Sequence, residues 1–211
     1  ERPVGSGYVF APYGQLHFAL QDFDDGRLST TNLVDITNAN SRIGFYIEPV
    51  DGGDGLSFQF ETGAGFRPSS NTSQVYVPEF FDWSRRDLRQ VQLIYKSGFG
   101  TFRAGQGSMP LDGAAESDLG GTVVAAKSTI QEANGSYLLR DATGVLSTIE
   151  IGDAFNNFDG ARRMRLRYDS PSVLGVSLAV GYGQEVLKSG DDKDYYDFAF
   201  RYRQDFSSVK V

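Results

Sequence analysis

Arginine side chains recur at two-residue intervals in this 211-residue sequence, most clearly at Arg163, Arg165 and Arg167. In an extended strand, residues two apart point to the same side, so these guanidinium groups would form a ladder on one face. Arg42 and Arg103 lie in two earlier stretches of alternating sequence and are further candidate basic residues. Fixed charges of this kind attract, orient or repel solutes without making or breaking bonds.

Cysteine and histidine, two of the side chains that most often carry out covalent catalysis, are nearly absent. The chain contains no cysteine, which excludes disulfides, thiolate zinc sites and cysteine nucleophiles. Its single histidine, His17, would have to serve any Ser–His arrangement, and no serine lies in a suggestive motif. We therefore expect neither an enzyme nor a bound cofactor. Residues 51–55 and 191–194 carry oxygen ligands of the kind that Ca²⁺ prefers, but neither has EF-hand spacing and turn chemistry explains both.

The arginines lie in stretches where apolar and polar residues alternate. This two-residue period predicts β-strands with one polar and one apolar face. The stretches are residues 15–21, 42–48, 56–61, 90–96, 101–104, 163–168, 174–183 and 196–203. Turns separate several of them, and in residues 97–100 glycine supplies the positive φ that a tight hairpin needs. The sequence therefore predicts an all-β, antiparallel protein with a single domain over residues 1–211.

The predicted polar face is rich in positive charge, whereas the predicted apolar face has no charged position. The basic residues of the polar face are Arg42, Lys96, Arg103, Arg163, Arg165, Arg167, Arg201 and Arg203. Its acidic residues are Glu48, Glu61 and Asp197. Because the whole chain has a net charge of −7, its negative charge must lie mainly in loops. The same net charge argues against a nucleic-acid binder, which needs a basic footprint.

Two-faced strands occur both in soluble β-sandwiches and in transmembrane β-barrels. Here the apolar face is dominated by Phe and Tyr, and several strands end in aromatic residues, including Tyr95, Tyr168 and Tyr202. A bilayer interface selects aromatic residues at such positions, because amphipathic rings are stable at headgroup depth. The pattern therefore favours a barrel whose apolar face contacts lipid. A soluble β-sandwich binding module is the alternative that this pattern leaves open.

Several strings, in this order and at about this spacing, resemble the Gram-negative general porins. They are SRIGF at residues 41–45, GFGTFRAG at 98–105 and RLRYDSPSVLGV at 165–176. Gly14-Gln15-Leu16 also resembles a common opening of the first strand in that family, and the resemblance extends to the end of the chain. It implies a sixteen-stranded, trimeric, water-filled barrel of the bacterial outer membrane, with the third extracellular loop folded into the lumen.

The resemblance assigns residues 107–121, which we call the constriction segment, to this inward-folded loop. Asp112, Glu116 and Asp118 would then face the basic wall and create a transverse field across the lumen. The implied function is passive diffusion of small hydrophilic solutes and ions. A substrate-selective channel of the same fold is the alternative, although Tyr46 is the only aromatic residue that we place on the polar face. The implied partners are two further copies in a homotrimer, outer-membrane lipid and lipopolysaccharide.

Two departures from the family pattern are visible. Gln106 stands where the family often has an arginine, which removes one basic residue from the expected pore wall. The alternating stretches are also too few for sixteen strands. We therefore expect an incomplete barrel, in which the C-terminal strands of the native protein are missing from this chain.

Overall fold

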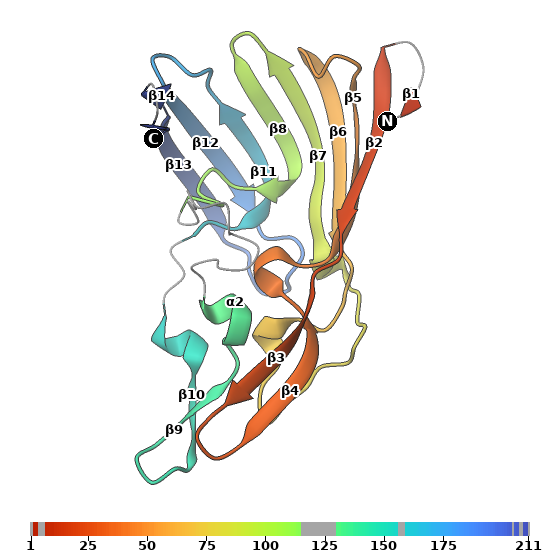
Figure 1. The fold of residues 1–211 in the computed structure, drawn as a ribbon. Helices are drawn as coiled ribbons and strands as arrows, with labels where there is room; N and C mark the ends of the chain where they lie inside the picture. The colour runs from red at the N-terminus through yellow and green to blue at the C-terminus, as the bar shows by residue number, and fades with distance from the viewer. Residues whose placement is uncertain are drawn as a thin grey trace.

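The computed structural model describes residues 2–3, 7–114, 130–155, 159–203, 205–206 and 209–210. Its main feature is one antiparallel sheet in which neighbouring strands follow one another along the chain, except for a short hairpin insertion after β2 and a second insertion after β8 (Figure 1). The strands of this sheet are, in spatial order, β1 (Arg2–Pro3), β2 (Tyr8–Gln15), β5 (Arg42–Pro49), β6 (Gly55–Gly63), β7 (Leu88–Ser97), β8 (Gly100–Ser108), β11 (Arg162–Asp169), β12 (Val176–Gln184) and β13 (Asp194–Tyr202).

Smaller elements lie outside this sheet. Three hairpins pair β3 (Phe18–Asp24) with β4 (Ser29–Asp35), β9 (Leu138–Arg140) with β10 (Leu146–Glu150), and β14 (Asp205–Phe206) with β15 (Val209–Lys210). Within the described ranges, the helical elements are α2 (Ile130–Asn134) and the 3₁₀ turns η1 (Thr37–Ala39), η2 (Ser69–Asn71), η3 (Arg85–Asp87) and η4 (Ile151–Ala154). Among the described residues, no helix is both long enough and apolar enough to span a bilayer.

The connections at the two ends of the sheet differ in length. At one end, residues 50–54, 98–99 and 170–175 form short turns. At the other end, the chain makes the long excursions 16–41, 64–87 and 109–161 (Figure 1). Barrels of the bacterial outer membrane have short periplasmic turns and longer extracellular loops. The same asymmetry orients this sheet.

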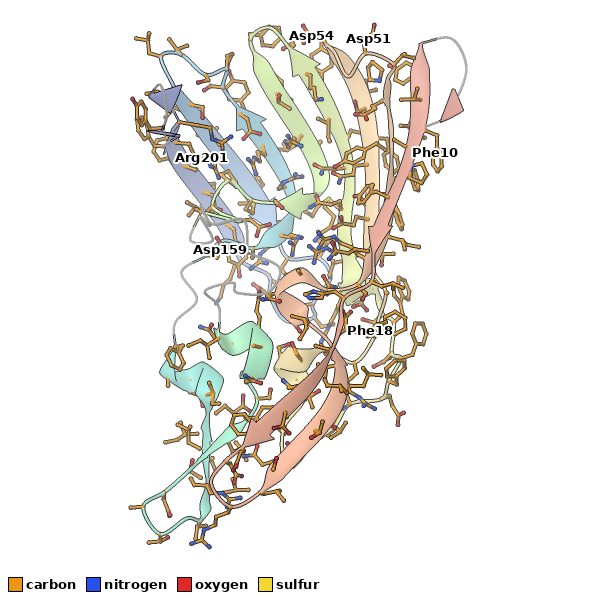
Figure 2. All side chains as sticks on the ribbon, in the orientation of Figure 1. Phe10, Phe18, Asp51, Asp54, Asp159 and Arg201 are labelled. Atoms are coloured by element: carbon orange, nitrogen blue, oxygen red, sulfur yellow. The ribbon has the colours of Figure 1, made fainter. Side chains whose placement is uncertain are left out.

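Burial in the sheet is the reverse of that in a soluble protein. Leu166 and Phe200 are 64% and 62% exposed, whereas Gln92 and Arg165 are 4% and 3% exposed. Figure 2 shows Phe10 on the outer side of β2, while Arg201 lies on the side that faces the constriction segment. The prediction that the apolar face points outward and the arginine-bearing face inward is confirmed. A soluble β-sandwich would bury its apolar face, so the burial contradicts that alternative.

The first strand differs from the prediction. The sequence pattern predicted a strand over residues 15–21, but β2 ends at Gln15 and β3 begins at Phe18. Gly14 and Gln15 therefore close the first strand of the sheet rather than open it. Pro12 hides the true strand from a pattern search, because a proline normally argues against a central strand. It is tolerated here because, among the described residues, β1 pairs with β2 at Val9 and Phe10 and no strand pairs with that edge beside Pro12.

The β3–β4 hairpin, α2 and the β9–β10 hairpin pack together beyond the sheet, and we call this assembly the loop ledge (Figure 1). Tyr137 is fully buried there, and its ring stacks on Phe23 at a centroid distance of 3.9 Å. Gln21 donates hydrogen bonds from its side chain to the Ala133 carbonyl oxygen at 2.5 Å and the Asn134 side chain at 2.9 Å. The excursion at 109–161 is thus held against the first excursion by both stacking and polar contacts.

Docking of the β9–β10 hairpin on the ledge is expected to depend on pH. Arg140 donates to Asp25 at 2.7 Å, and this hydrogen bond holds the pKa of the Asp25 carboxyl well below its usual range. Because the pKa of Asp25 is lower in the docked form than in the undocked form, the ion pair stabilises docking fully when the pH is above the ordinary Asp pKa of about 3.9. This stabilisation is lost progressively as the pH falls below that value. The protection of the amides at residues 138–150, measured as their exchange rate relative to the intrinsic rate at the same pH, should therefore fall below about pH 4.

The variant Asp25→Asn should show fast exchange at residues 138–150 already at neutral pH. Asp54→Asn, in an exposed turn at the other end of the sheet (Figure 2), is the matched control and should behave like the unmodified chain. Identical exchange in the two variants would contradict a role for the Asp25–Arg140 pair.

Gly105 is expected to be intolerant of any side chain. It lies within β8 at φ +121°, and an added Cβ would clash with the Val91 carbonyl oxygen of β7. Gly105→Ala should lower the free energy of unfolding by about 1–3 kcal/mol, because it combines an unfavourable φ with a backbone clash. Gly98→Ala is the control, since a Cβ there meets nothing within 4 Å. Urea unfolding in lipid vesicles measures both, and equal midpoints would contradict the prediction.

Candidate functional site

Three neighbouring strands bring a carboxylate and two guanidinium groups together on the polar face. Glu61 of β6 is 7% exposed and lies between Arg42 of β5 and Arg89 of β7. The Arg42 Nε to Glu61 Oε2 distance is 3.5 Å, and the Arg89 Nε to Glu61 Oε1 distance is 2.5 Å. Arg89 also donates to the Asn40 side chain at 2.9 Å. This cluster holds more positive than negative charge at the loop end of the wall.

A β-bulge places Arg89 on this face. Glu61 pairs with Gln90 and Thr62 pairs with Leu88, which leaves Arg89 as the extra residue of β7. Strict alternation would put Arg89 on the apolar face, and a bulge re-aims such a side chain. Sequence reasoning missed Arg89 because the predicted strand began at residue 90. The sequence did contain one indication of the bulge, because Arg89 directly precedes the predicted strand at a position that strict alternation assigns to the apolar face.

Arg165 is a buried anchor in the middle of the wall. Its guanidinium donates to the carbonyl oxygens of Ser108 at 2.7 Å and Gly105 at 2.9 Å, and to the Gln92 side chain at 2.7 Å. Gln92 in turn donates to the Gln59 side chain at 2.6 Å. Because Arg165 is enclosed and all three contacts are acceptors, it ties β11 to β7 and to the end of β8 instead of presenting a free charge to solvent.

Arg103 and Arg167 share one carboxylate, that of Asp169. Arg103 Nε lies 3.3 Å from Asp169 Oδ2, and Arg167 Nη2 lies 2.6 Å from Asp169 Oδ1. Arg167 also donates to the carbonyl oxygens of Ser108 at 3.1 Å and Met109 at 3.0 Å. Two cations with one anion leave a net positive charge at the turn end of this wall.

Arg163 lies at the other end of the ladder. It forms an ion pair with Glu185 at 3.1 Å, and its guanidinium sits 4.4 Å from the centre of the Tyr195 ring. The three arginines of the ladder thus share the polar face, as the spacing predicted. Their partners differ along the strand, so the three side chains have different environments.

The described start of the constriction segment lies on the polar wall. Arg201 donates to the Pro110 carbonyl oxygen at 2.5 Å, and the Leu111 amide donates to Asp197 at 3.2 Å. An added Cβ at Gly181 would meet the Pro110 ring at 2.7 Å, so this glycine makes room for the loop. The segment therefore folds inward over β12 and β13 within residues 109–114, as predicted.

Asp112 is the one predicted acidic residue that the structure describes. Its Oδ2 lies 3.8 Å from Nε of Arg162, the first residue of β11, so Asp112 pairs with an arginine that was not among the predicted basic residues. Glu116 and Asp118 lie outside the described residues.

A polar cavity of about 340 Å³ adjoins these groups. Charged side chains of both signs line it, including Arg89, Arg162, Asp112 and Glu185. Gln106 also lines it, and the buried Gln106 Oε1 has no hydrogen-bond partner. Among the described residues, no group of three or more His, Asp or Glu side chains could hold a metal ion. The arrangement can therefore bind water and act on solutes through its fixed charges.

Comparison with known protein families identifies the family of this chain. The profile of the Gram-negative porins matches residues 10–211. This chain belongs to the Gram-negative porin family. The porin is therefore a protein of the bacterial outer membrane, and its apolar face points outward, as in outer-membrane barrels. The family resemblance read from the sequence strings is confirmed.

Among solved structures, the porin is similar to a loop-deletion mutant of OmpT, an outer membrane protein of Vibrio cholerae. The two chains are 15% identical with a TM-score of 0.48, and the match covers 97% of this chain and 51% of that one. The porin chain thus spans about half the length of that structure. A search of curated proteins found no match.

Proposed function

We propose that this porin is a passive diffusion channel for small hydrophilic solutes and ions. The carrying observation is the charged inner wall with the start of the constriction segment folded onto it, held there by the Asp112–Arg162 ion pair at 3.8 Å. Fixed charges along a narrow aqueous passage orient dipolar solutes and disfavour apolar ones, so filtering needs no chemical step. We further propose that the native protein is a homotrimer in contact with outer-membrane lipid and lipopolysaccharide.

One observation favours the alternative of a substrate-selective channel. Tyr13 joins Tyr46 on the polar face, and their rings stack at a centroid distance of 5.4 Å. The Tyr13 hydroxyl also accepts a hydrogen bond from the Gln59 side chain at 2.9 Å. Paired rings beside amide groups would suit a sugar, although they form only a short aromatic surface.

Planar-bilayer recordings on the native protein, purified from outer membranes, test the proposal. Passive diffusion predicts large ohmic steps that no solute saturates. Silence from correctly folded protein would contradict channel activity altogether. Saturable block by a neutral sugar, lost on Tyr46→Ala, would instead support the selective channel.

Reversal potentials in a salt gradient test the role of the wall charges. Arg42→Gln should raise the cation-to-anion permeability ratio, and Asp112→Asn should lower it, each by about twofold to fivefold. Asp51→Asn, in an exposed turn away from the segment (Figure 2), removes the same charge as Asp112→Asn and should leave the ratio unchanged. Equal shifts from the two aspartate variants would mean that net charge, and not position, sets selectivity.

A further inference from the structure

The lipid-facing surface contains a groove of about 560 Å³. Its lining includes Leu93 of β7, Ala104 of β8 and Leu166 of β11, and the strand register places Ala104 directly between the two leucines. Ala104 is the one small residue among the outward positions of the alternating stretches. The groove therefore exists because large side chains surround a single methyl group.

Tyrosine hydroxyls hold two walls of this groove in place. Tyr168 donates to the Phe99 carbonyl oxygen at 2.7 Å, and its ring contacts Phe102 at a centroid distance of 4.9 Å. Tyr182 donates to Asp194 at 2.8 Å. Because both hydroxyls are already bonded, the rings are fixed before anything enters, and a preorganised site loses less entropy on binding.

The surroundings of the groove identify its occupant by chemistry. The groove is almost wholly apolar and lies on the face that contacts hydrocarbon, so it continues the lipid interface. Its aromatic wall of Tyr95, Phe102 and Tyr168 adjoins the short turns, which mark the periplasmic end in outer-membrane barrels. We propose that one acyl chain of a phospholipid in the periplasmic leaflet binds in this groove in preference to the rest of the lipid-facing surface.

Brominated-lipid quenching of a single tryptophan tests this proposal. Trp83 is the only tryptophan among residues 1–211, so Trp83→Phe, together with Phe at any tryptophan elsewhere in the native protein, gives a silent background. Phe102→Trp places a probe in the groove wall. Phe198→Trp is the matched control, because the pairings Phe102–Tyr168, Tyr168–Val180 and Val180–Phe198 put both positions in one row across the sheet. The native protein carrying each pair of substitutions is titrated in detergent with a phospholipid whose acyl chains are brominated.

The expected result is that the groove probe is half-quenched at a lipid fraction at least about tenfold lower than the control, since each additional buried methylene contributes a factor of about four. Adding Ala104→Leu, or the smaller change Ala104→Val, should move the groove probe toward the control profile. Identical profiles for the two probes would overturn the proposal. Weaker quenching of the groove probe than of the control would also overturn it, because another protein surface would then cover the groove.

Discussion

Replacing Arg165 with leucine is expected to lower the free energy of unfolding by about 3 kcal/mol, since two buried acceptors each lose a partner at about 1–3 kcal/mol. These acceptors are the carbonyl oxygen of Gly105 and the side chain of Gln92, whereas the carbonyl oxygen of Ser108 keeps its bond from Arg167. The lost contacts to Gly105 and Ser108 lie toward the end of β8, just before the loop that folds inward. The same substitution should therefore also loosen the constriction segment and increase current noise in open channels.

Urea unfolding in lipid vesicles, followed by tryptophan fluorescence, measures this loss. Arg103→Leu is the matched control on the same face, because Arg103 is 30% exposed and its partner Asp169 keeps Arg167. A part-exposed ion pair of this kind is worth less than about 1 kcal/mol. Arg165→Lys should fall between the two, since an ammonium group cannot reproduce the fork of contacts. Equal losses from Arg165→Leu and Arg103→Leu would contradict the anchoring role.

A charge on the outer face should be nearly as damaging. Leu166 lies in the middle of β11 and is 64% exposed on the outward apolar face, which in an outer-membrane barrel faces hydrocarbon. Leu166→Arg should lower the free energy of unfolding by about 2–4 kcal/mol, the cost measured for arginine near the bilayer midplane. In a soluble protein the same change at so exposed a position would have little effect.

Leu174→Arg provides the comparison for the outer-face prediction. Leu174 is 90% exposed in the turn at residues 170–175, close to the bilayer surface. The cost of arginine falls to about 0–1 kcal/mol near the interface. Similar unfolding free energies for the two variants would mean that Leu166 does not face the hydrocarbon core.

Alternation alone predicted which way the sheet faces, because a two-residue period assigns every side chain of a strand at once. It failed where that period is interrupted. Pro12 concealed the strand Tyr8–Gln15, and the bulge at Arg89 moved a charge from one face to the other. The local pattern does not show the first effect and only hints at the second, through an arginine in the apolar phase, since both depend on which strand lies alongside.

The sequence predicted which face of the sheet carries the candidate site, but it did not predict the burial or the partners of the individual side chains. The spacing of Arg163, Arg165 and Arg167 put them together, but it did not show that Arg165 would be enclosed. That burial comes from the end of β8 and the start of the inward loop, which lie more than fifty residues earlier in the chain. Glu116 and Asp118 stay predictions.

The close packing of the Pro110 ring against Gly181 affects the width of the pore inside the barrel. Since the strand offers no side chain at that point, the loop rests directly on the backbone and occupies the least room inside. A methyl or larger group at residue 181 would lift the loop away from β12 and narrow the bore. The clearance available to a solute is thus adjustable by one uncharged substitution, independently of every arginine and carboxylate that faces the water.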